Sequence, residues 1–177
     1  LETAASLAVE KVVAHPAAIS GMGVFVPELA RQHAYESLAV IASKATELGV
    51  SLCLENMFPR SRFGVDVAEF RDIFNRFPTL KLTLDTGHAN IGSPRGKRIL
   101  KFIEAFAERL GHIHVSDNFG KVDNHLPIGS GNIQFTKILT ALKKTGYNGT
   151  VTFEVFTPDR EYLQLSRHKF DQIWRSI

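Results

Sequence analysis

The run Ser51-Leu52-Cys53-Leu54-Glu55 alternates leucine with small or polar side chains and ends on a carboxylate. Successive side chains of a β-strand point to opposite faces, so the leucines face one side and Ser51, Cys53 and Glu55 the other. Parallel strands that are covered by helices on both faces are almost continuously apolar. This run therefore predicts a strand with one apolar and one polar face.

Four further runs are rich in strand-forming residues, and segments with helical spacing of apolar residues separate them. The predicted strands are 11–15, 51–55, 81–85, 112–116 and 150–154. The predicted helices are 1–10, 27–48, 66–77, 97–110, 136–145 and 160–177. This alternation predicts an α/β fold with a parallel sheet and helical crossovers.

Two architectures satisfy the alternation, a doubly wound open sheet and a TIM (β/α)8-type barrel. The polar strand face favours the barrel, whose lumen and mouth are lined by such residues. A barrel needs eight βα units in about 250 residues, and residues 1–177 supply five in what we predict to be a single domain. We therefore expect the first three units to be missing and the native protein to be longer, because an open sheet would expose two edges.

The composition is typical of a soluble globular domain, with 44% hydrophobic and 22% charged residues, and excludes disorder, collagen and coiled coil. The single cysteine, Cys53, cannot form an internal disulfide or a cysteine-based zinc cage, so we expect a cytoplasmic enzyme. We expect neither a membrane span nor a signal peptide. The net charge of +3 is dispersed along the chain and gives only a weak indication of a polyanionic partner.

Acidic or imidazole side chains stand at or near the C-terminal ends of all five predicted strands. They are His15, Glu55, Asp85, His114 and Glu154, with His88 three residues after Asp85. In a barrel these ends converge on one mouth. Three carboxylates meeting in a partly desolvated cleft are unfavourable without a cation, so the pattern predicts a divalent metal: manganese, zinc, cobalt or magnesium. Taken singly, each acid could instead cap a helix or form an ion pair.

The loop after the fourth strand contains Asp123 and His125, which are two residues apart and can converge on one cation. A glycine turn with two solvated polar groups is the alternative. Gly129 and Gly131 allow tight backbone turns, but their spacing and the missing lysine do not match a P-loop. We expect Asp117 to cap or turn the start of this loop, and a functional role is the alternative.

Six motifs together resemble, in order and spacing, the xylose isomerase-like TIM barrel superfamily. They are 13–16 (VAHP), 54–56 (LEN), 84–90 (LDTGHAN), 112–118 (HIHVSDN), 123–131 (DNHLPIGSG) and 153–154 (FE). This superfamily contains sugar isomerases and epimerases as well as apurinic-site nucleases of the endonuclease IV type. The resemblance covers essentially the whole chain and implies that it corresponds to barrel strands four to eight.

The ketose 3-epimerase branch implies a single divalent metal. Its ligands would be Glu55, Asp85, His114 and Glu154. Glu55 and Glu154 would also be the catalytic residues, removing and returning a carbon-bound proton through an enediolate. His88 would contact a small-molecule substrate, a sugar or a sugar phosphate. The arginine that follows the histidine strand in these epimerases has no clear match here.

The nuclease branch implies three zinc ions. The first ion would be held by His15 and Glu55, the second by Glu55, Asp85, His114 and Glu154, and the third by His88, Asp123 and His125. Gly87 occupies the position at which the nuclease motif usually has cysteine, and the sequence Ser116-Asp117-Asn118 resembles that of the sugar-isomerase branch. We therefore predict a metal-dependent sugar or sugar-phosphate isomerase or epimerase. The alternative is a zinc-dependent apurinic/apyrimidinic endonuclease with a DNA substrate, and a homo-oligomer is compatible with both.

Overall fold

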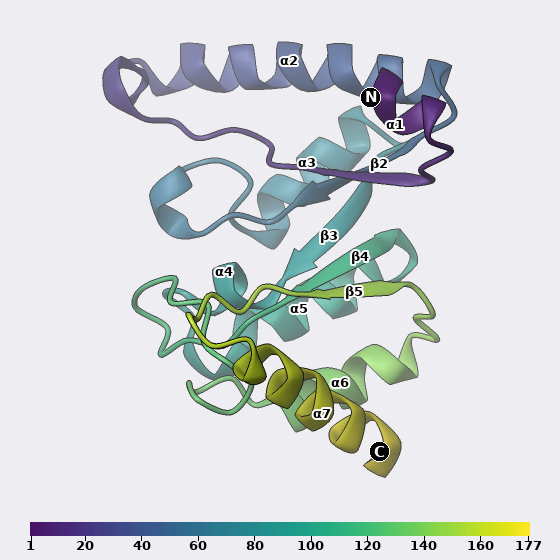
Figure 1. The fold of residues 1–177 in the computed structure, drawn as a ribbon. Helices are drawn as coiled ribbons and strands as arrows, with labels where there is room; N and C mark the ends of the chain where they lie inside the picture. Colours follow the sequence, from purple (N-terminus) through teal and green to yellow (C-terminus); the bar gives the residue numbers. More distant parts are fainter.

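Five parallel strands form one sheet in the order β1-β2-β3-β4-β5 in the computed structural model, which describes residues 1–177. The strands are β1 (Lys11–Ala14), β2 (Ser51–Glu55), β3 (Lys81–Asp85), β4 (Leu110–Val115) and β5 (Thr150–Phe153). Figure 1 shows the helices around the outer side of a curved sheet, while the loops that follow the strands gather at one end. The predicted alternation is confirmed as a TIM-barrel-like half-barrel.

Seven α-helices precede, connect or follow these strands. They are α1 (Glu2–Ser6), α2 (Pro27–Glu47), α3 (Val67–Arg76), α4 (Thr86–Asn90), α5 (Lys97–Phe106), α6 (Phe135–Lys144) and α7 (Glu161–Ser176). The first helix is shorter than predicted, because the chain turns out of the helix after Ser6, where Ala8 has a φ of +53°. The predicted helix 97–110 gives way to a 3-10 turn after Phe106, and β4 begins at Leu110. Helix α4 was not predicted.

The apolar core lies between the outer face of the sheet and the helices. Leu54, Leu82 and Leu84 are almost fully buried there, as their parity in the strands predicts. Aromatic rings fill the space between α3 and α5, where Phe70 and Phe102 meet edge to face with centroids 5.4 Å apart. The opposite, concave face carries the small and polar residues, so the core fixes the sheet while leaving that face available for chemistry.

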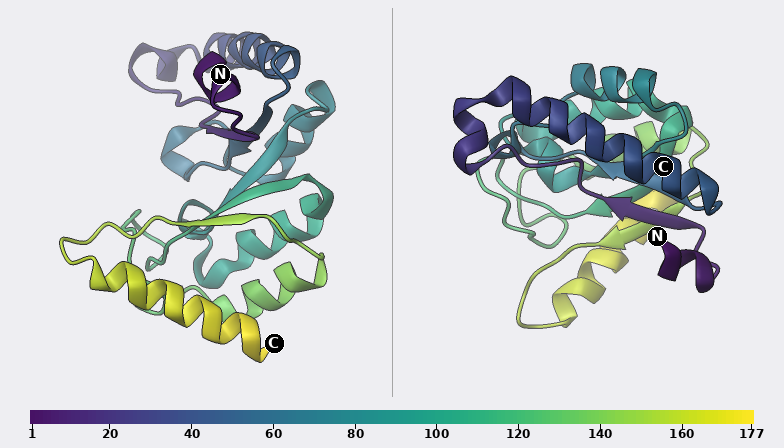
Figure 2. Two further views of the ribbon diagram at one scale, coloured as in Figure 1. Left: turned by 45° about the vertical axis from the view of Figure 1, so that its right-hand side comes forward. Right: turned by 90° about the horizontal axis from the view of Figure 1, so that it is seen from above.

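The two edge strands differ from the three central ones in exposure. Every residue of β2 and β3 after the first is buried, whereas β1 and β5 have no buried residue. Figure 2 shows β1 and β5 on opposite borders of the open sheet. No helix combines the length and the apolar character that crossing a membrane requires.

Candidate metal centre

Four side chains meet at the C-terminal end of the sheet, and we call them the strand-end cluster. They are Glu55, Asp85, His114 and Glu154, and one ligand atom from each lies within 4.8 Å of the others. The parallel register places Asp85 beside His114 on the neighbouring strand. Each side chain therefore reaches the mouth because backbone hydrogen bonds fix its strand.

The imidazole of His114 stands at the middle of the strand-end cluster. Its Nδ1 atom lies 3.3 Å from Glu55 Oε2, 3.8 Å from Asp85 Oδ2 and 3.2 Å from Glu154 Oε1. Glu55 and Asp85 are at most 2% exposed, whereas the Glu154 side chain is 25% exposed. Glu154 is thus the carboxylate of the cluster most accessible from the mouth.

Two buried atoms of the strand-end cluster have no hydrogen-bond partner, Asp85 Oδ2 and His114 Nδ1. Burying a polar atom without a hydrogen-bond partner raises the free energy of the folded state, so two such atoms close together indicate a ligand site. Donor atoms around a four-coordinate ion at ~2.1 Å lie roughly 3.4 Å apart, close to the separations around His114. Mixed carboxylate and imidazole donors suit a divalent ion, so these residues fit the predicted metal.

Burial and mutual proximity shift the ionisation of the strand-end cluster. Burial raises the pKa of Asp85 to about 7, with His88 opposing this and Glu55 adding to it. Burial by itself raises the pKa of Glu55, but the adjacent imidazoles of His114 and His88 outweigh it and bring that pKa to about 2. Burial lowers the pKa of His114, and the neighbouring carboxylates more than reverse this, so the net shift is upward.

A second group, the loop cluster, lies beside the first and consists of His88, Asp123 and His125. Asp123 Oδ2 lies 3.2 Å from His88 Nε2 and 2.9 Å from His125 Nε2. The other oxygen, Asp123 Oδ1, is buried without a hydrogen-bond partner. His88 comes from α4, whereas Asp123 and His125 come from the loop after β4.

His88 joins the two clusters. Its Nδ1 atom lies 3.2 Å from Glu55 Oε1, and its backbone N–H donates to Asp85 Oδ1 at 2.6 Å. Burial lowers the pKa of His88, but Asp123 and Glu55 outweigh it and raise the pKa to about 11. Asp85 thus caps the short helix that carries His88 with one oxygen and turns the other toward His114. Asp85 therefore both caps a helix and belongs to the strand-end cluster.

Asn56 clamps the ends of β2 and β3, a role that the sequence analysis did not assign. Its side chain accepts from Asp85 N at 2.8 Å and donates to Asp85 O at 3.1 Å. The amide thereby continues the ladder one step beyond the strands and fixes the backbone on which Asp85 stands. An amide directly after a strand-end glutamate is the only signal that the sequence offers for this.

The remaining predicted residues take less central positions. His15 lies 3.4 Å from Glu55 Oε2 through its Nε2 atom, but its side chain is 63% exposed. His112 lies deeper on the concave face, with its ring nitrogens 2.7 and 2.9 Å from the hydroxyls of Thr150 and Thr152. Cys53 is fully buried and free.

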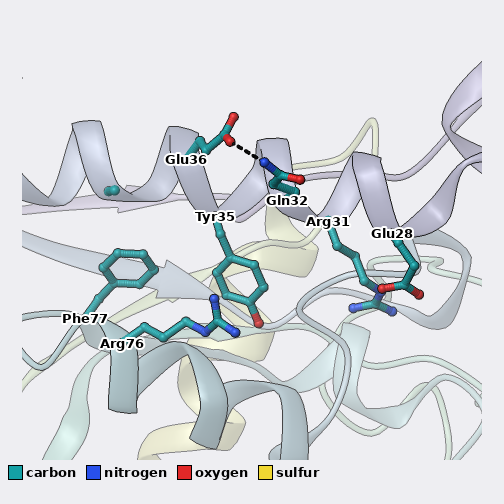
Figure 3. A pocket seen from close by; sticks show the side chains of 8 residues that line it. Glu28, Arg31, Gln32, Tyr35, Glu36, Arg76 and Phe77 are labelled. Atoms are coloured by element: carbon teal, nitrogen blue, oxygen red, sulfur yellow. Dashed lines mark hydrogen bonds between the residues drawn. The ribbon is translucent and has the colours of Figure 1, made fainter.

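A hollow of about 580 Å³ between α2 and α3 lies apart from both clusters. Figure 3 shows Tyr35 and Arg76 extending into it, and the Arg76 guanidinium lies 4.2 Å from the centre of the Tyr35 ring. Its lining includes Glu28 and Glu36 but no histidine or cysteine. This hollow offers no competing metal centre.

A family model described as a xylose isomerase-like TIM barrel matches residues 1–172. The chain belongs to this family. The resemblance predicted from the six motifs is thereby confirmed, and the two clusters occupy the mouth of a xylose isomerase-like half-barrel.

Proteins that are similar to this chain in sequence include sugar epimerases. An uncharacterized protein of Methanocaldococcus jannaschii is 34% identical over 164 residues, which are 87% of this chain and 53% of the relative. The L-ribulose 3-epimerase of Methylomonas sp. is 28% identical over 163 residues, 88% of this chain and 53% of the enzyme. A crystal structure of a D-tagatose 3-epimerase-like protein matches with a TM-score of 0.87 and 28% identity, covering 99% of this chain and 66% of that one. The chain spans about half the length of the curated relatives that it matches.

Proposed function

We propose that this chain carries the metal and catalytic centre of a divalent-metal-dependent sugar or sugar-phosphate isomerase or epimerase. The observation that carries the proposal is the strand-end cluster, in which Asp85 Oδ2 and His114 Nδ1 are both buried without a hydrogen-bond partner. Similarity to an L-ribulose 3-epimerase supports the reaction class.

The proposed ligands are the four residues of the strand-end cluster. When bound there, a divalent ion supplies Lewis-acid polarisation of the sugar carbonyl, which acidifies the neighbouring C–H bond. The chain itself must then remove a proton from that carbon and return it, so that the substrate passes through an enediolate. Two carboxyl groups on opposite sides of the substrate suffice for this, because the ionised one can take the proton while the protonated one returns a proton to the opposite face.

Glu55 and Glu154 are the proposed proton-transfer residues. Each directs one oxygen at His114 and the other at an imidazole of the loop cluster. Glu55 Oε1 lies 3.2 Å from His88 Nδ1, and Glu154 Oε2 lies 3.9 Å from His125 Nδ1. One oxygen of each can therefore serve the metal while the other holds or moves a proton. His88, Asp123 and His125 would orient the hydroxyl groups of the sugar.

We also propose that the five units form one domain and correspond to strands four to eight of a (β/α)8 barrel. The exposed edges of β1 and β5 and the length of the relatives support this. Closing a barrel pairs both edges and abolishes them.

The replacement Glu154→Gln tests the proton-transfer role. General acid–base catalysis contributes about 10²–10⁴-fold, so we expect turnover on a ketose panel to fall by that factor at a divalent-metal concentration that saturates both proteins. Incorporation of solvent deuterium at the epimerised carbon should fall in parallel. The control is Glu161→Gln in the exposed first turn of α7, which should match wild type. Unchanged turnover in Glu154→Gln would exclude Glu154 as a proton-transfer residue.

An apurinic-site endonuclease remains the second candidate, because the loop cluster and the His15–Glu55 contact occupy the additional metal positions of that branch. Elemental analysis of protein purified without chelator separates the two. We expect about one divalent ion per chain. About three zinc ions, with cleavage of abasic-site DNA and no sugar turnover, would replace our proposal by the nuclease.

A further inference from the structure

Asp117 is a fully buried carboxylate that belongs to neither cluster. It lies two residues after the end of β4, at the start of the loop that carries Asp123 and His125. None of the ion pairs in the chain includes Asp117. A buried carboxylate without a cation must be stabilised by hydrogen-bond donors, since transfer of an unpaired charge out of water is very unfavourable.

Four backbone N–H groups of the loop supply those donors. Asn118 N and Ile133 N donate to Asp117 Oδ1 at 2.9 and 3.2 Å. Gly129 N and Gly131 N donate to Asp117 Oδ2 at 3.0 and 2.9 Å. The two ends of the loop and its glycine turn therefore converge on a single side chain.

The glycine turn is shaped around this carboxylate. A Cβ atom on Gly131 would lie 2.3 Å from Asp117 Oδ1 and 2.4 Å from the Asn118 carbonyl oxygen, so only glycine fits there. Gly129 has a φ of +83°, a conformation that glycine adopts readily. The glycine turn, whose sequence does not match a P-loop, thus surrounds a carboxylate of the protein itself.

The middle of the loop is strained and is held by the same residue. His125 has a φ of +47°, and a side-chain-bearing residue in this region costs roughly 1–2 kcal/mol. Leu126, the residue after His125, pairs with the backbone of Asp117. Asp117 N donates to Leu126 O at 2.8 Å, and Leu126 N donates to Asp117 O at 2.9 Å. The strained conformation that turns His125 toward Asp123 is therefore adjacent to a fixed point of the loop.

A further contact docks the loop against the helix that carries His88. Asn118 Nδ2 donates to the carbonyl oxygen of Gly87 at 2.8 Å, directly before His88. The conformation of the loop around Asp117 therefore helps to determine the distance between His88 and Asp123.

We propose that Asp117 is a positioning residue, the internal anion around which residues 118–133 fold so that Asp123 and His125 are held against His88. It touches neither the proposed metal ligands nor the substrate and acts through the loop cluster. The kinetic consequence rests on the proposed epimerase function, in which the loop cluster orients the sugar. The structural consequence does not depend on that function.

The replacement Asp117→Asn tests the proposal, because it turns one of the two acceptor oxygens into a donor at nearly constant volume. That oxygen is shared either by Gly129 N and Gly131 N or by Asn118 N and Ile133 N. We expect amide hydrogen exchange of Gly129, Gly131 and Ile133 to accelerate about tenfold or more, since hydrogen bonds to charged groups are the strong ones. Metal per chain should not change. With an active ketose, KM should rise about tenfold while kcat changes less than about threefold.

Two controls separate this role from a general loss of structure. Asp123→Asn removes a member of the loop cluster but leaves Asp117 in place, so the three amides should keep their protection while KM rises. Asp66→Asn alters an aspartate that caps α3, and both exchange and kinetics should match wild type. If no sugar is turned over by wild type, the proposed function fails and the exchange result still decides the role of Asp117.

Unchanged exchange at the three amides in Asp117→Asn would overturn the proposal. If that variant does not fold, Gly131→Ala takes its place, because the added methyl group forces the turn away from an intact Asp117. We then expect accelerated exchange of Gly129 and Ile133 with normal metal content. Exchange at the wild-type rate in Gly131→Ala would equally contradict the proposal.

Discussion

The strand-end cluster and the loop cluster lie side by side, yet different parts of the chain position them. Strand ends, paired by backbone hydrogen bonds, place Glu55, Asp85 and His114. A short helix and an irregular loop place His88, Asp123 and His125. The first cluster follows from the fold alone, whereas the second depends on hydrogen bonds specific to the loop.

The clusters also differ in charge. The strand-end cluster combines three carboxylates with one imidazole, so like charges oppose each other unless a cation is bound. In the loop cluster one carboxylate lies between two imidazoles, and burial is outweighed by His125 and His88, so the pKa of Asp123 is held well below its usual range. In the proposed function an external cation would compensate the carboxylates of the first cluster, whereas the second cluster is balanced within itself.

The largest expected effect is on cation affinity. Replacing a residue that only hydrogen-bonds to a metal ligand already lowers metal affinity about 10–100-fold, so Asp85→Ala, which removes a proposed ligand, should lower it more than about 100-fold. Asp123→Ala should lower it less than about threefold, because the loop cluster is not expected to hold the ion. Isothermal titration with Mn²⁺ or Zn²⁺ measures both variants. Equal losses would show that the clusters act as one site.

The next effect is stabilisation by the ion itself. A ligand that binds only the folded chain stabilises it by about 2.7 kcal/mol at 100 times its Kd, which corresponds to an increase in Tm of about 5–10 °C. Thermal unfolding with and without EDTA should show this increase for wild type and for Asp123→Ala. Asp85→Ala should show none, and an increase in that variant would place the cation elsewhere.

The same difference explains how far sequence alone could predict the site. The positions of Asp85 and His114 at the mouth could be predicted, because strand periodicity and the convergence of parallel strands determine where their side chains point. The contact between Asp123 and His88 could be suggested only from spacing and family resemblance. Helix α4, the positive φ of His125 and the burial of Asp117 depend on tertiary hydrogen bonds that have no periodic signal.

A smaller effect is expected at the clamp that supports the strand-end cluster. Asn56→Ala removes both hydrogen bonds to the backbone of Asp85 and leaves its buried N–H unpaired, which costs about 1–3 kcal/mol. Urea unfolding of the metal-free protein measures this loss. Asn132→Ala, which removes a more exposed amide of the loop, should cost less than half as much. The opposite order would mean that the loop, rather than the strand ends, is the better fixed region.

The smallest effect is one of opposite sign in the two clusters. In metal-free protein at pH 8, Asp85→Asn removes one of three mutually repelling carboxylates, so it should stabilise the fold by about 1 kcal/mol, as replacements at strained functional sites often do. Asp123→Asn removes the negative charge of the acceptor shared by His88 and His125 and should destabilise the fold by about 1 kcal/mol. Urea unfolding in EDTA compares the two variants, and adding the divalent ion should reverse the ranking of Asp85→Asn and wild type. Destabilisation by both replacements without metal would show that the strand-end carboxylates are already compensated by the protein, and the charge argument for a bound cation would fail.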